Sequence, residues 1–407
     1  MNTEYFIAKK LFSTKEKNIS YTKPIFRIAI LAISLSVAIM LISVMILSGF
    51  KNDISSKIIG FGSHITISNF TNNNSYETEP TSINKELYDS INNDEDIKNI
   101  NVFATKAAII KTVDEIHGVV LKGVSTDYDW DFFRSNLVAG DILSLVDSIK
   151  SNDILISKEV ANTLRLDVAD DLVMYFIQNP SRVRKFNIKG IYTTDMVDFD
   201  KLYVIGDIKH IQALNSWGDT LVGGFEIAIN NFDDLDLITE RLYQKTPSFL
   251  DVQSIKEKVP QIFDWLDLQD VNVRLILILI LIVSSVNMIT CLLILILDRT
   301  HLIGVLKALG ATNWSIRKVF LYITTNLLLK GLVLGNVIAL SFALLQKEFS
   351  LISLEPATYY MQTVPISFNF LDILLLNIGT VLISYVILIF PSVIITKITP
   401  IKAIRFE

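Results

Sequence analysis

Residues 275–297 read LILILILIVSSVNMITCLLILIL, a run of 23 residues without a charged side chain. At about 1.5 Å of rise per residue, a helix of this length spans roughly 35 Å and can cross a hydrocarbon core of about 30 Å. Similar runs occupy 28–49, 319–345 and 373–396, and Lys330 interrupts the third of the four. The sequence therefore predicts four transmembrane helices, with a gap of 225 residues between the first two.

The charges beside these runs predict their orientation, because short cytoplasmic segments of membrane proteins carry an excess of lysine and arginine. Basic residues outnumber acidic ones six to two in 1–27, four to one in 298–318 and three to one in 397–407. Segment 50–272 instead holds 35 acidic and 21 basic residues. We therefore expect both termini in the cytoplasm and segment 50–272 on the opposite side of the membrane.

The first run follows six basic residues, as the apolar part of a secretory signal does. It is longer than the roughly 7 to 15 apolar residues of a signal peptide, and no small-residue cleavage pattern follows it, so we interpret it as a retained anchor. Cys291 is the only cysteine and lies in the second run. Segment 50–272 therefore has no disulfide, but it is long enough to be held by a hydrophobic core.

The pattern as a whole predicts an α-helical membrane protein whose four transmembrane helices carry a large α+β extracytoplasmic domain, inserted between the first and second helix. The expected boundaries are a cytoplasmic segment at 1–27, the first transmembrane helix at 28–49, the extracytoplasmic domain at 50–272, the second helix at 273–297, a cytoplasmic loop at 298–318, the third helix at 319–345, a short extracytoplasmic loop at 346–369, the fourth helix at 370–396 and a cytoplasmic tail at 397–407.

Within the insert, alternation of apolar and polar residues predicts strands, and apolar residues at helical spacing predict helices between them. The expected strands are His64–Asn69, Phe103–Thr112, Leu172–Ile177 and Phe225–Asn230, and the expected helices are Ile83–Ile97, Lys158–Leu164 and Leu235–Lys245. At the two ends, 51–59 and 259–266 predict helical stalks that either join the motion of the domain to the membrane helices or simply pack on the domain.

Signatures of catalysis and nucleotide binding are absent from the sequence. It has no phosphate-binding loop of the form Gly-x₄-Gly-Lys-Ser/Thr and no Gly-x-Ser-x-Gly elbow, and its four histidines lie far apart without metal-ligand spacing. We expect a non-catalytic protein without a cofactor or metal of its own and without a nucleic-acid partner. A partner protein would then supply the energy for any work that it performs.

The cytoplasmic segment 298–318 reads DRTHLIGVLKALGATNWSIRK. Its apolar residues recur at helical spacing, and Gly310 can adopt the left-handed conformation that ends a helix. The segment therefore predicts a short amphipathic helix between the second and third membrane helices. Such a helix could lie in the lipid interface, or it could dock into a groove on a soluble motor.

This segment resembles the coupling loop of the FtsX-like ABC permease superfamily, whose pattern reads Arg-x-x-Glu-Ile-Gly-Ile-x-x-Ala-Leu-Gly-Ala. Leu302 stands where the family has glutamate, and Pro400–Glu407 resembles the family ending Pro-x-x-Ala-Leu-Arg-Tyr-Glu. The resemblance implies that a separate ATPase binds ATP and Mg²⁺. The residues that it assigns to ATPase coupling are Arg299, Leu302, Ile303, Leu306, Lys307 and Gly310.

Within that superfamily, Ser48–Ile67, Leu121–Val124 and Leu137–Asp141 resemble segments of the lipoprotein-releasing, Lol-type permeases. The resemblance implies a multi-pass protein of the bacterial inner membrane with its large domain in the periplasm. The partners that it implies are a cytoplasmic ABC ATPase dimer, a second permease subunit in a homodimer or heterodimer, a lipoprotein cargo, a periplasmic lipoprotein chaperone and membrane lipid.

In the chaperone-recruiting members of that family, a proline-containing hairpin of the periplasmic domain acts as a hook. The matching stretch here is 178–184, with Asn179, Pro180, Ser181 and Arg182 as the hook residues that the resemblance implies. Asn-Pro-Ser is also an ordinary turn composition between strands. The chain could therefore be the hook-bearing subunit, the partner without a hook, or both in a homodimer.

Inside the third membrane helix, Gly331 and Gly335 form a small-residue face that lets another helix approach closely, within this chain or from another one. Lys330 lies beside them, and an ammonium there is costly unless it is paired, hydrated or reaching toward the interface. We expect either a helix-pairing or lipid-contact residue, or a side chain that extends toward the cytoplasmic surface.

The resemblance implies a mechanism in which ATP-driven closure of the motor moves the coupling helix, and acyl chains enter between the first helix of one permease and the second helix of the other. Ile39–Leu47 and Leu275–Val283 are the expected walls of that cavity. Two other functions share the four-helix plan. One is MacB-like efflux or mechanotransmission, and the other is FtsX-like activation of a periplasmic hydrolase during division without transport.

Overall fold

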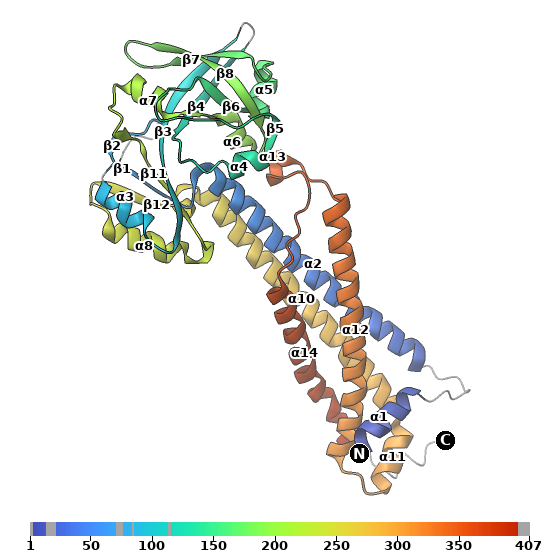
Figure 1. Ribbon diagram of the computed structural model, residues 1–407. Coiled ribbons are helices and arrows are strands. Elements are labelled where there is room, and N and C mark those ends of the chain that lie inside the picture. Colours follow the sequence, from blue (N-terminus) through green and yellow to red (C-terminus); the bar gives the residue numbers. More distant parts are fainter. Residues whose placement is uncertain (1–2, 14–21, 71–75, 84, 113–114, 398–407) are drawn as a thin grey trace. The chain divides into compact units, whose positions relative to one another are not determined.

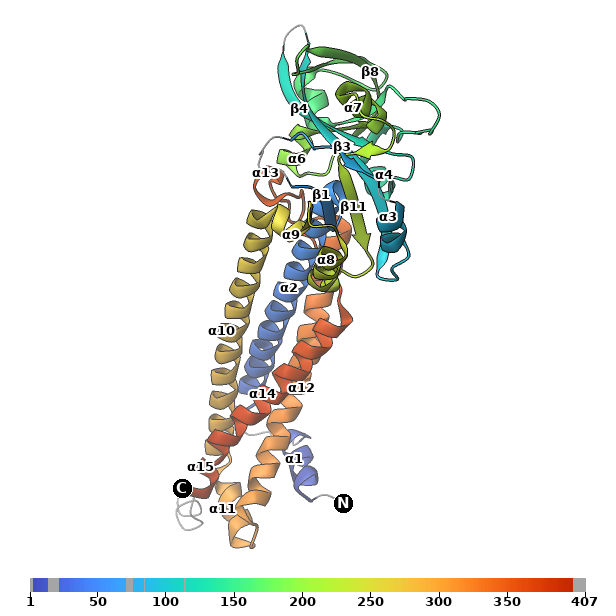
Figure 2. The same ribbon diagram turned by 90° about the vertical axis from the view of Figure 1, so that its left-hand side faces the viewer.

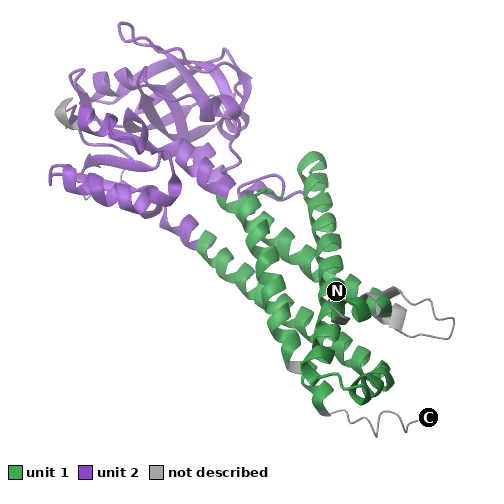
Figure 3. Cartoon of the chain, turned by 60° about the horizontal axis from the view of Figure 1, so that its bottom comes forward, with its two compact units in different colours: residues 1–51, 266–352, 364–407 green, residues 52–265, 353–363 purple. Residues whose placement is uncertain are grey.

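The computed structural model describes residues 3–13, 22–70, 76–83, 85–112 and 115–397. The chain divides into two units, which are coloured separately in Figure 3. Unit 1 consists of Met1–Lys51, Leu266–Ile352 and Val364–Glu407, and unit 2 consists of Asn52–Trp265 and Ser353–Thr363. A short segment from the loop between the third and fourth apolar helices therefore belongs to unit 2, which the sequence did not indicate.

Four helices of the described residues are long and apolar enough to cross a membrane, and they lie side by side in Figures 1 and 2. The run with Lys330 forms one unbroken helix with its flanks. The long helices are α2 (Thr22–Gly62), α10 (Pro260–Asp298), α12 (Asn313–Phe349) and α14 (Phe370–Ser392), and the short helices of this part are α1 (Thr3–Ser13), α11 (Thr300–Ala308) and α15 (Ile394–Lys397).

Unit 2 contains a ten-stranded sheet within the described ranges, in the order β12-β1-β11-β3-β4-β9-β6-β8-β5, while β7 pairs with both β3 and β8. A separate two-stranded sheet joins β10 and β2. The strands are β1 (Ile65–Asn69), β2 (Thr81–Ser82), β3 (Ile97–Lys111), β4 (Ile116–Val124), β5 (Leu137–Gly140), β6 (Asp153–Ser157), β7 (Asp171–Phe176), β8 (Arg182–Tyr192), β9 (Tyr203–Asp207), β10 (Leu221–Val222), β11 (Gly224–Ile229) and β12 (Leu250–Ser254).

The two halves of the long strand β3 pair with different strands. Its first half pairs with β11 in the open part of the sheet, from Ile97 opposite Ile229 to Phe103 opposite Gly224. Its second half pairs with β4 and, at Ile109 and Ile110, with β7. Since β4, β9, β6, β8 and β7 are paired in that order, the pairing returns to β3 and forms a closed ring.

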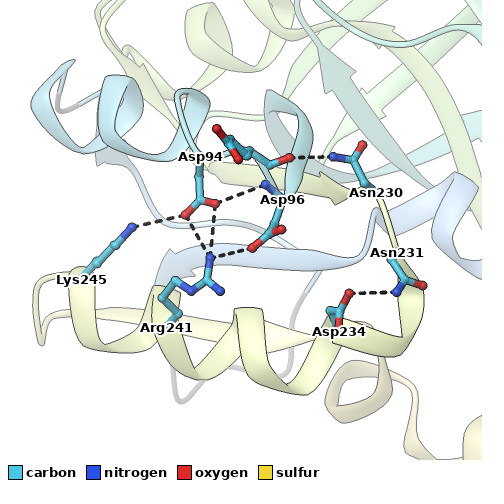
Figure 4. A network of polar contacts seen from close by, with 8 residues as sticks. Asp94, Asp96, Asn230, Asn231, Asp234, Arg241 and Lys245 are labelled. Atoms are coloured by element: carbon cyan, nitrogen blue, oxygen red, sulfur yellow. Dashed lines mark hydrogen bonds and ion pairs between the residues drawn. The ribbon is translucent and has the colours of Figure 1, made fainter.

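Helices accompany both parts of the sheet in unit 2. The network in Figure 4 joins α8 to the turn after α3: Arg241 lies 2.8 Å from Asp96 and 3.3 Å from Asp94, and Lys245 lies 3.3 Å from Asp94. The helices are α3 (Lys85–Asn92), α4 (Asp131–Ser135), α5 (Lys158–Leu164), α6 (Val197–Leu202), α7 (Ile208–Asn215), α8 (Leu235–Lys245), α9 (Ile255–Lys258) and α13 (Pro356–Tyr359).

Most of the predicted elements of the insert are confirmed. The expected helices at Lys158–Leu164 and Leu235–Lys245 match α5 and α8, and the four predicted strands fall on β1, β3, β7 and β11. The prediction of a helix through Ile97 was wrong, because α3 ends at Asn92 and Ile97 begins β3. A turn intervenes there, in which the Ile97 N–H donates to the Asp94 carbonyl and Asp94 is held by the cations of α8.

Candidate functional site

The predicted coupling helix is present as α11, between α10 and α12. Gly310 has a left-handed φ of +89°, and the N–H of Ala311 donates to the Leu306 carbonyl at 3.0 Å, so the predicted C-terminal cap is confirmed. Lys307 does not extend freely, because its Nζ donates to the carbonyl of Ile395 at 2.7 Å. This bond ties α11 to α15 within unit 1.

The apolar side of α11 faces its own unit. Ile303 is fully buried, and Leu306 packs against the same hydrophobic core. These two predicted coupling residues therefore anchor the helix and present little surface to a partner. Leu302 is half-buried, and Arg299 lies 3.2 Å from the Asp298 carboxylate at the start of the helix.

Two large apolar side chains remain outside this core at the end of the coupling segment. Leu309 is 80% exposed and Trp314 is 55% exposed. Thr312 caps α12 between them by accepting a hydrogen bond from the Ser315 N–H at 3.2 Å. We call Leu309 and Trp314 the coupling patch, because both are large apolar side chains that remain exposed in this segment. The sequence signal that could have identified Trp314 is its place just after a helix N-cap.

The small-residue face of α12 packs against α2 of the same chain. A Cβ added at Gly331 would lie 2.6 Å from a side-chain carbon of Ile33, and one added at Gly335 would lie 2.7 Å from the Ser34 carbonyl. The face continues through Ala339, which is fully buried. Of the two interpretations of Gly331 and Gly335, the structure supports packing within the chain.

Lys330 is exposed in unit 1, beside the buried Gly331. A polar contact that the sequence did not indicate lies six residues further along α12, at Asn336. Asn336 Nδ2 donates to Asn377 Oδ1 at 2.7 Å, and Asn377 Nδ2 donates back to Asn336 Oδ1 at 3.0 Å. This reciprocal amide pair joins α12 to α14, as polar side chains do between membrane helices.

The two expected cavity walls differ in exposure. Much of 275–283 on α10 is exposed, including Leu275, Leu279 and Val283. On α2, the expected wall at 39–47 is only partly exposed, since Ile39 is 41% exposed while Met40 and Met45 are buried in unit 1, and its role as a wall stays a prediction. The exposed apolar face of α2 lies earlier in the helix, at Ile28, Leu31, Leu35 and Ile39.

The candidate hook is a tight turn between β7 and β8. Asn179, Pro180 and Ser181 are exposed at its tip, while Arg182 begins β8. The turn is attached to α7 by two bonds, from Gln178 Nε2 to the Leu214 carbonyl at 3.2 Å and from Arg182 to the Ala213 carbonyl at 3.0 Å. The structure thus places a short, anchored turn at the position that the family resemblance implied.

Two of the segments that resemble Lol-type permeases, Ser48–Ile67 and Leu121–Val124, meet at the end of α2. The Phe61 carbonyl accepts a hydrogen bond from Lys122 Nζ, and the same ammonium bonds both oxygens of Glu226 at 2.7 and 2.8 Å. All three residues are buried. Gly123 is needed beside Lys122, because a Cβ there would lie 2.6 Å from the Ile208 Cα. This buried ion pair attaches the last turn of α2 to the sheet of unit 2.

The segment Ser353–Thr363 is also bonded within unit 2. Lys57 Nζ donates to the Tyr360 carbonyl at 3.0 Å and lies 3.1 Å from the Asp53 carboxylate. Gln362 Nε2 donates to Asp195 Oδ1 at 2.7 Å. In the described part of the chain, no three His, Cys, Asp or Glu side chains are grouped so that they could hold a metal ion.

The four long apolar helices, the mixed α and β unit and the coupling helix together define a membrane protein of the ABC permease type. Residues 27–260 match the MacB-like periplasmic core domain, and residues 274–400 match the FtsX-like permease C-terminal family. The chain belongs to the FtsX-like permeases that carry a MacB-like periplasmic core domain. The resemblance found in the coupling segment is therefore confirmed. Pro400–Glu407, its second part, lies outside the described residues.

Individual relatives extend over nearly the whole chain. The lipoprotein-releasing system transmembrane protein LolC of Buchnera aphidicola subsp. Schizaphis graminum is 23% identical over 95% of each chain. The transmembrane protein LolE of the same type of system in Haemophilus influenzae is 21% identical over 98% of each chain. The crystal structure of the periplasmic region of MacB from Actinobacillus actinomycetemcomitans covers 51% of this chain and 95% of its own, with 13% identity and a TM-score of 0.35.

Proposed function

We propose that this chain is the membrane subunit of an ABC transporter that extracts lipoproteins from the bacterial inner membrane and hands them to a periplasmic carrier. The observation that carries the proposal is the match to proteins named for lipoprotein release over 95% or more of both chains. Such a match includes the apolar helices, the coupling segment and the large mixed domain together. The proposal rests on the family match, which identifies the chain as a permease of the FtsX-like type.

The proposed partners are those that the family resemblance implies, and each is assigned to a surface of the structure. A cytoplasmic ATPase dimer, which would bind ATP and Mg²⁺, docks on the coupling patch of Leu309 and Trp314. A second permease, identical or different, covers part of the exposed apolar face of α10. The carrier is recruited either by the turn at 178–184 or by the second permease. Both termini are cytoplasmic and unit 2 is periplasmic in this arrangement.

In the proposed cycle, closure of the ATPase dimer moves α11, and the bonded α15 moves with it. The shift is transmitted through α10 and α2, whose ends form part of unit 2. Acyl chains of the cargo would lie against the exposed faces of α10 and α2 before release. Extraction costs about 0.8 kcal/mol per CH₂ removed from lipid, which is why a motor is needed.

Depletion of this protein in its native host tests the proposal. Inner and outer membranes would be separated and acylated proteins followed in both fractions. We expect outer-membrane lipoproteins to accumulate in the inner membrane, and a plasmid copy of the wild-type gene to reverse the accumulation.

The other two functions predict different outcomes of the same experiment. An unchanged lipoprotein distribution with increased drug sensitivity would point to efflux of the MacB type, which the family match over 27–260 also permits. An unchanged distribution with defective septation would point to a division regulator. Either outcome would contradict lipoprotein release.

A further inference from the structure

A cavity of about 380 Å³ lies within unit 2. The last turn of α2 and the short helix α9 contribute to its wall, and so do β3, β4 and α6. Its volume is within the range of about 300–1,000 Å³ that is typical of small-molecule sites. The aromatic residues that line it are Phe61, Tyr76, Phe103, Phe199 and Tyr203.

The aromatic lining favours a flat or branched apolar body in the cavity. The Phe61 ring stacks on Phe199 with centroids 5.2 Å apart and lies 5.9 Å from Tyr203. Such rings provide a large apolar contact area with few rotatable bonds, and they are preferred in ligand sites for this reason. Apolar packing alone does not select a ligand, so the charged groups of the wall decide its chemistry.

Two lysine ammonium groups line the cavity, and they differ in how many hydrogen-bond acceptors and carboxylates surround them. Lys122 has three donor hydrogens and three acceptors, the Phe61 carbonyl and the two oxygens of Glu226. Lys258 donates to Thr66 Oγ1 at 3.2 Å and lies 5.7 Å from the centre of the Phe103 ring, and it forms no ion pair in the described part of the chain. Lys258 therefore retains donors and positive charge.

Lys258 is an exposed residue that lines the cavity without a carboxylate of its own at ion-pair distance in the described part of the chain. Packing of the protein around its ammonium lowers the pKa by desolvation, Glu226 opposes this effect, and the neighbouring Lys122 adds to it. Glu226 is already shared with Lys122 at 2.7 Å. Asp198 is a second carboxylate that lines the cavity, and it is exposed. The acidic group of a ligand beside Lys258 would stabilise the charged form of its ammonium by forming the ion pair that this lysine lacks in the described part of the chain.

We propose that this cavity binds a small organic anion, whose apolar body packs among the aromatic rings and whose acidic group pairs with Lys258. The matching ligands are monocarboxylates or sulfonates on a compact aromatic or branched aliphatic frame. The bound ligand would contact the last turn of α2 and the helix α9 at the same time. Binding here requires neither the ATPase nor the transport of lipoproteins, so it can be tested separately from the proposed function.

The test uses the full chain in lipid nanodiscs with para-trifluoromethylbenzoate as the probe and fluorine NMR as the readout. The neutral para-trifluoromethylbenzamide has nearly the same shape and reports non-specific partition into lipid. We expect saturable binding of the benzoate at millimolar concentration and at least about tenfold weaker binding of the amide, which corresponds to roughly 1.4 kcal/mol.

Two lysine variants locate the site. Lys258→Met should weaken benzoate binding at least tenfold. Lys256→Met is the matched control, because it removes the same charge from the same helix while its ammonium pairs with Asp236 at 3.2 Å outside the cavity. Val259→Trp, which fills the cavity, should abolish binding of the benzoate, and circular dichroism would verify that each variant is folded.

Three results would overturn the proposal. They are no saturable binding of the benzoate by the wild-type chain, equal binding of the benzoate and the amide, and equal loss of binding in Lys258→Met and Lys256→Met. Retention of binding in a folded Val259→Trp variant would place the ligand elsewhere and would overturn it as well.

Discussion

At the residue scale, Gly331 and Gly335 bring the backbones of α2 and α12 together. A methyl group at either position would lie within 2.7 Å of an atom of α2, which is closer than non-bonded atoms approach. Gly379 on α14 provides the contrast, since a methyl group there would meet nothing within 4 Å. The two kinds of glycine lie in helices of the same unit and differ only in their neighbours.

We therefore expect Gly335→Ala to destabilise unit 1 by about 1–3 kcal/mol, the usual cost of overpacking. Gly379→Ala should be neutral or stabilising by up to about 1 kcal/mol, because alanine favours a helix more than glycine does. The thermal unfolding midpoint of the full chain in detergent measures both. Equal midpoints for the two variants would show that the close packing of α12 on α2 does not limit stability.

His64, directly before β1, contributes to the stability of the fold in a way that depends on the protonation of its imidazole ring. Burial, with a further effect of Lys98, lowers the pKa of its imidazole to about 4. Its Nδ1 accepts a hydrogen bond from the Ile229 N–H at 3.4 Å, which requires the neutral ring. The pKa of His64 in the folded protein lies below its unfolded value near 6.5. Its contribution to folding stability is therefore complete above about pH 6.5 and is lost as the pH falls toward 4.

The expected consequence is a loss of up to about 3 kcal/mol in the local stability of the β1–β11 pair between pH 6.5 and pH 4. Hydrogen exchange of the Ile227 and Ile229 amides in the full chain, corrected for the intrinsic rate, measures it. His64→Gln keeps an acceptor without a titratable ring and should lose most of this pH dependence. The hypothesis fails if the variant and the wild type change equally over that range.

At the scale of elements, α11 has an amphipathic pattern, but its apolar side packs against the chain itself. Ile303 is fully buried there and Leu306 is partly buried, whereas Leu309 lies past the last helical residue and remains exposed. A helix held in this way can transmit force from a partner that touches only its end and the start of α12. The surface that we propose for docking is thus smaller than the amphipathic helix that the sequence pattern predicts.

We expect Leu309→Asp to abolish co-purification of the ATPase subunit without unfolding the permease, because Leu309 is 80% exposed. The matched control is Leu237→Asp on α8, where a leucine that is 60% exposed lies in unit 2. Affinity purification of the tagged chain followed by quantification of the ATPase measures both variants. Full recovery of the ATPase with Leu309→Asp would refute docking at the coupling patch.

At the scale of the whole molecule, charge divides the chain more sharply than its total of −5 suggests. Segment 50–272 has 14 more acidic than basic residues, while the remainder has 9 more basic than acidic residues. Lysine and arginine retain short loops in the cytoplasm, so this asymmetry predicts one orientation for all four helices. The chain has a single cysteine, Cys291, which is buried, and this makes the orientation accessible to labelling.

In a Cys291→Ala background, Leu237→Cys should react with a membrane-impermeant maleimide in cells whose outer membrane has been permeabilised. Leu309→Cys should react only after the inner membrane is lysed. The background without cysteine serves as the control for non-specific labelling. Labelling of Leu309→Cys in intact spheroplasts would reverse the orientation and would remove the cytoplasmic motor from the proposed function.

Sequence patterns within single segments were enough to predict many elements of the fold. The four long helices, α5, α8 and the turn between β7 and β8 follow from hydropathy, helical spacing and turn composition, which depend on neighbours in the chain. Sequence reasoning located only the second half of β3, because the first half reads Ile97-Lys-Asn-Ile-Asn and its burial against β11 depends on a strand more than a hundred residues away.

The sequence by itself determined the number of long apolar helices, their charge asymmetry, the coupling segment and the family. Only the tertiary structure decided that Gly331 and Gly335 face α2, that Asn336 pairs with Asn377, and that Lys122 pairs with Glu226 while donating to the Phe61 carbonyl. Local periodicity states which residues share a face of a helix or strand. It contains no information on which distant segment covers that face, because burial and ion pairing are decided by contacts between elements.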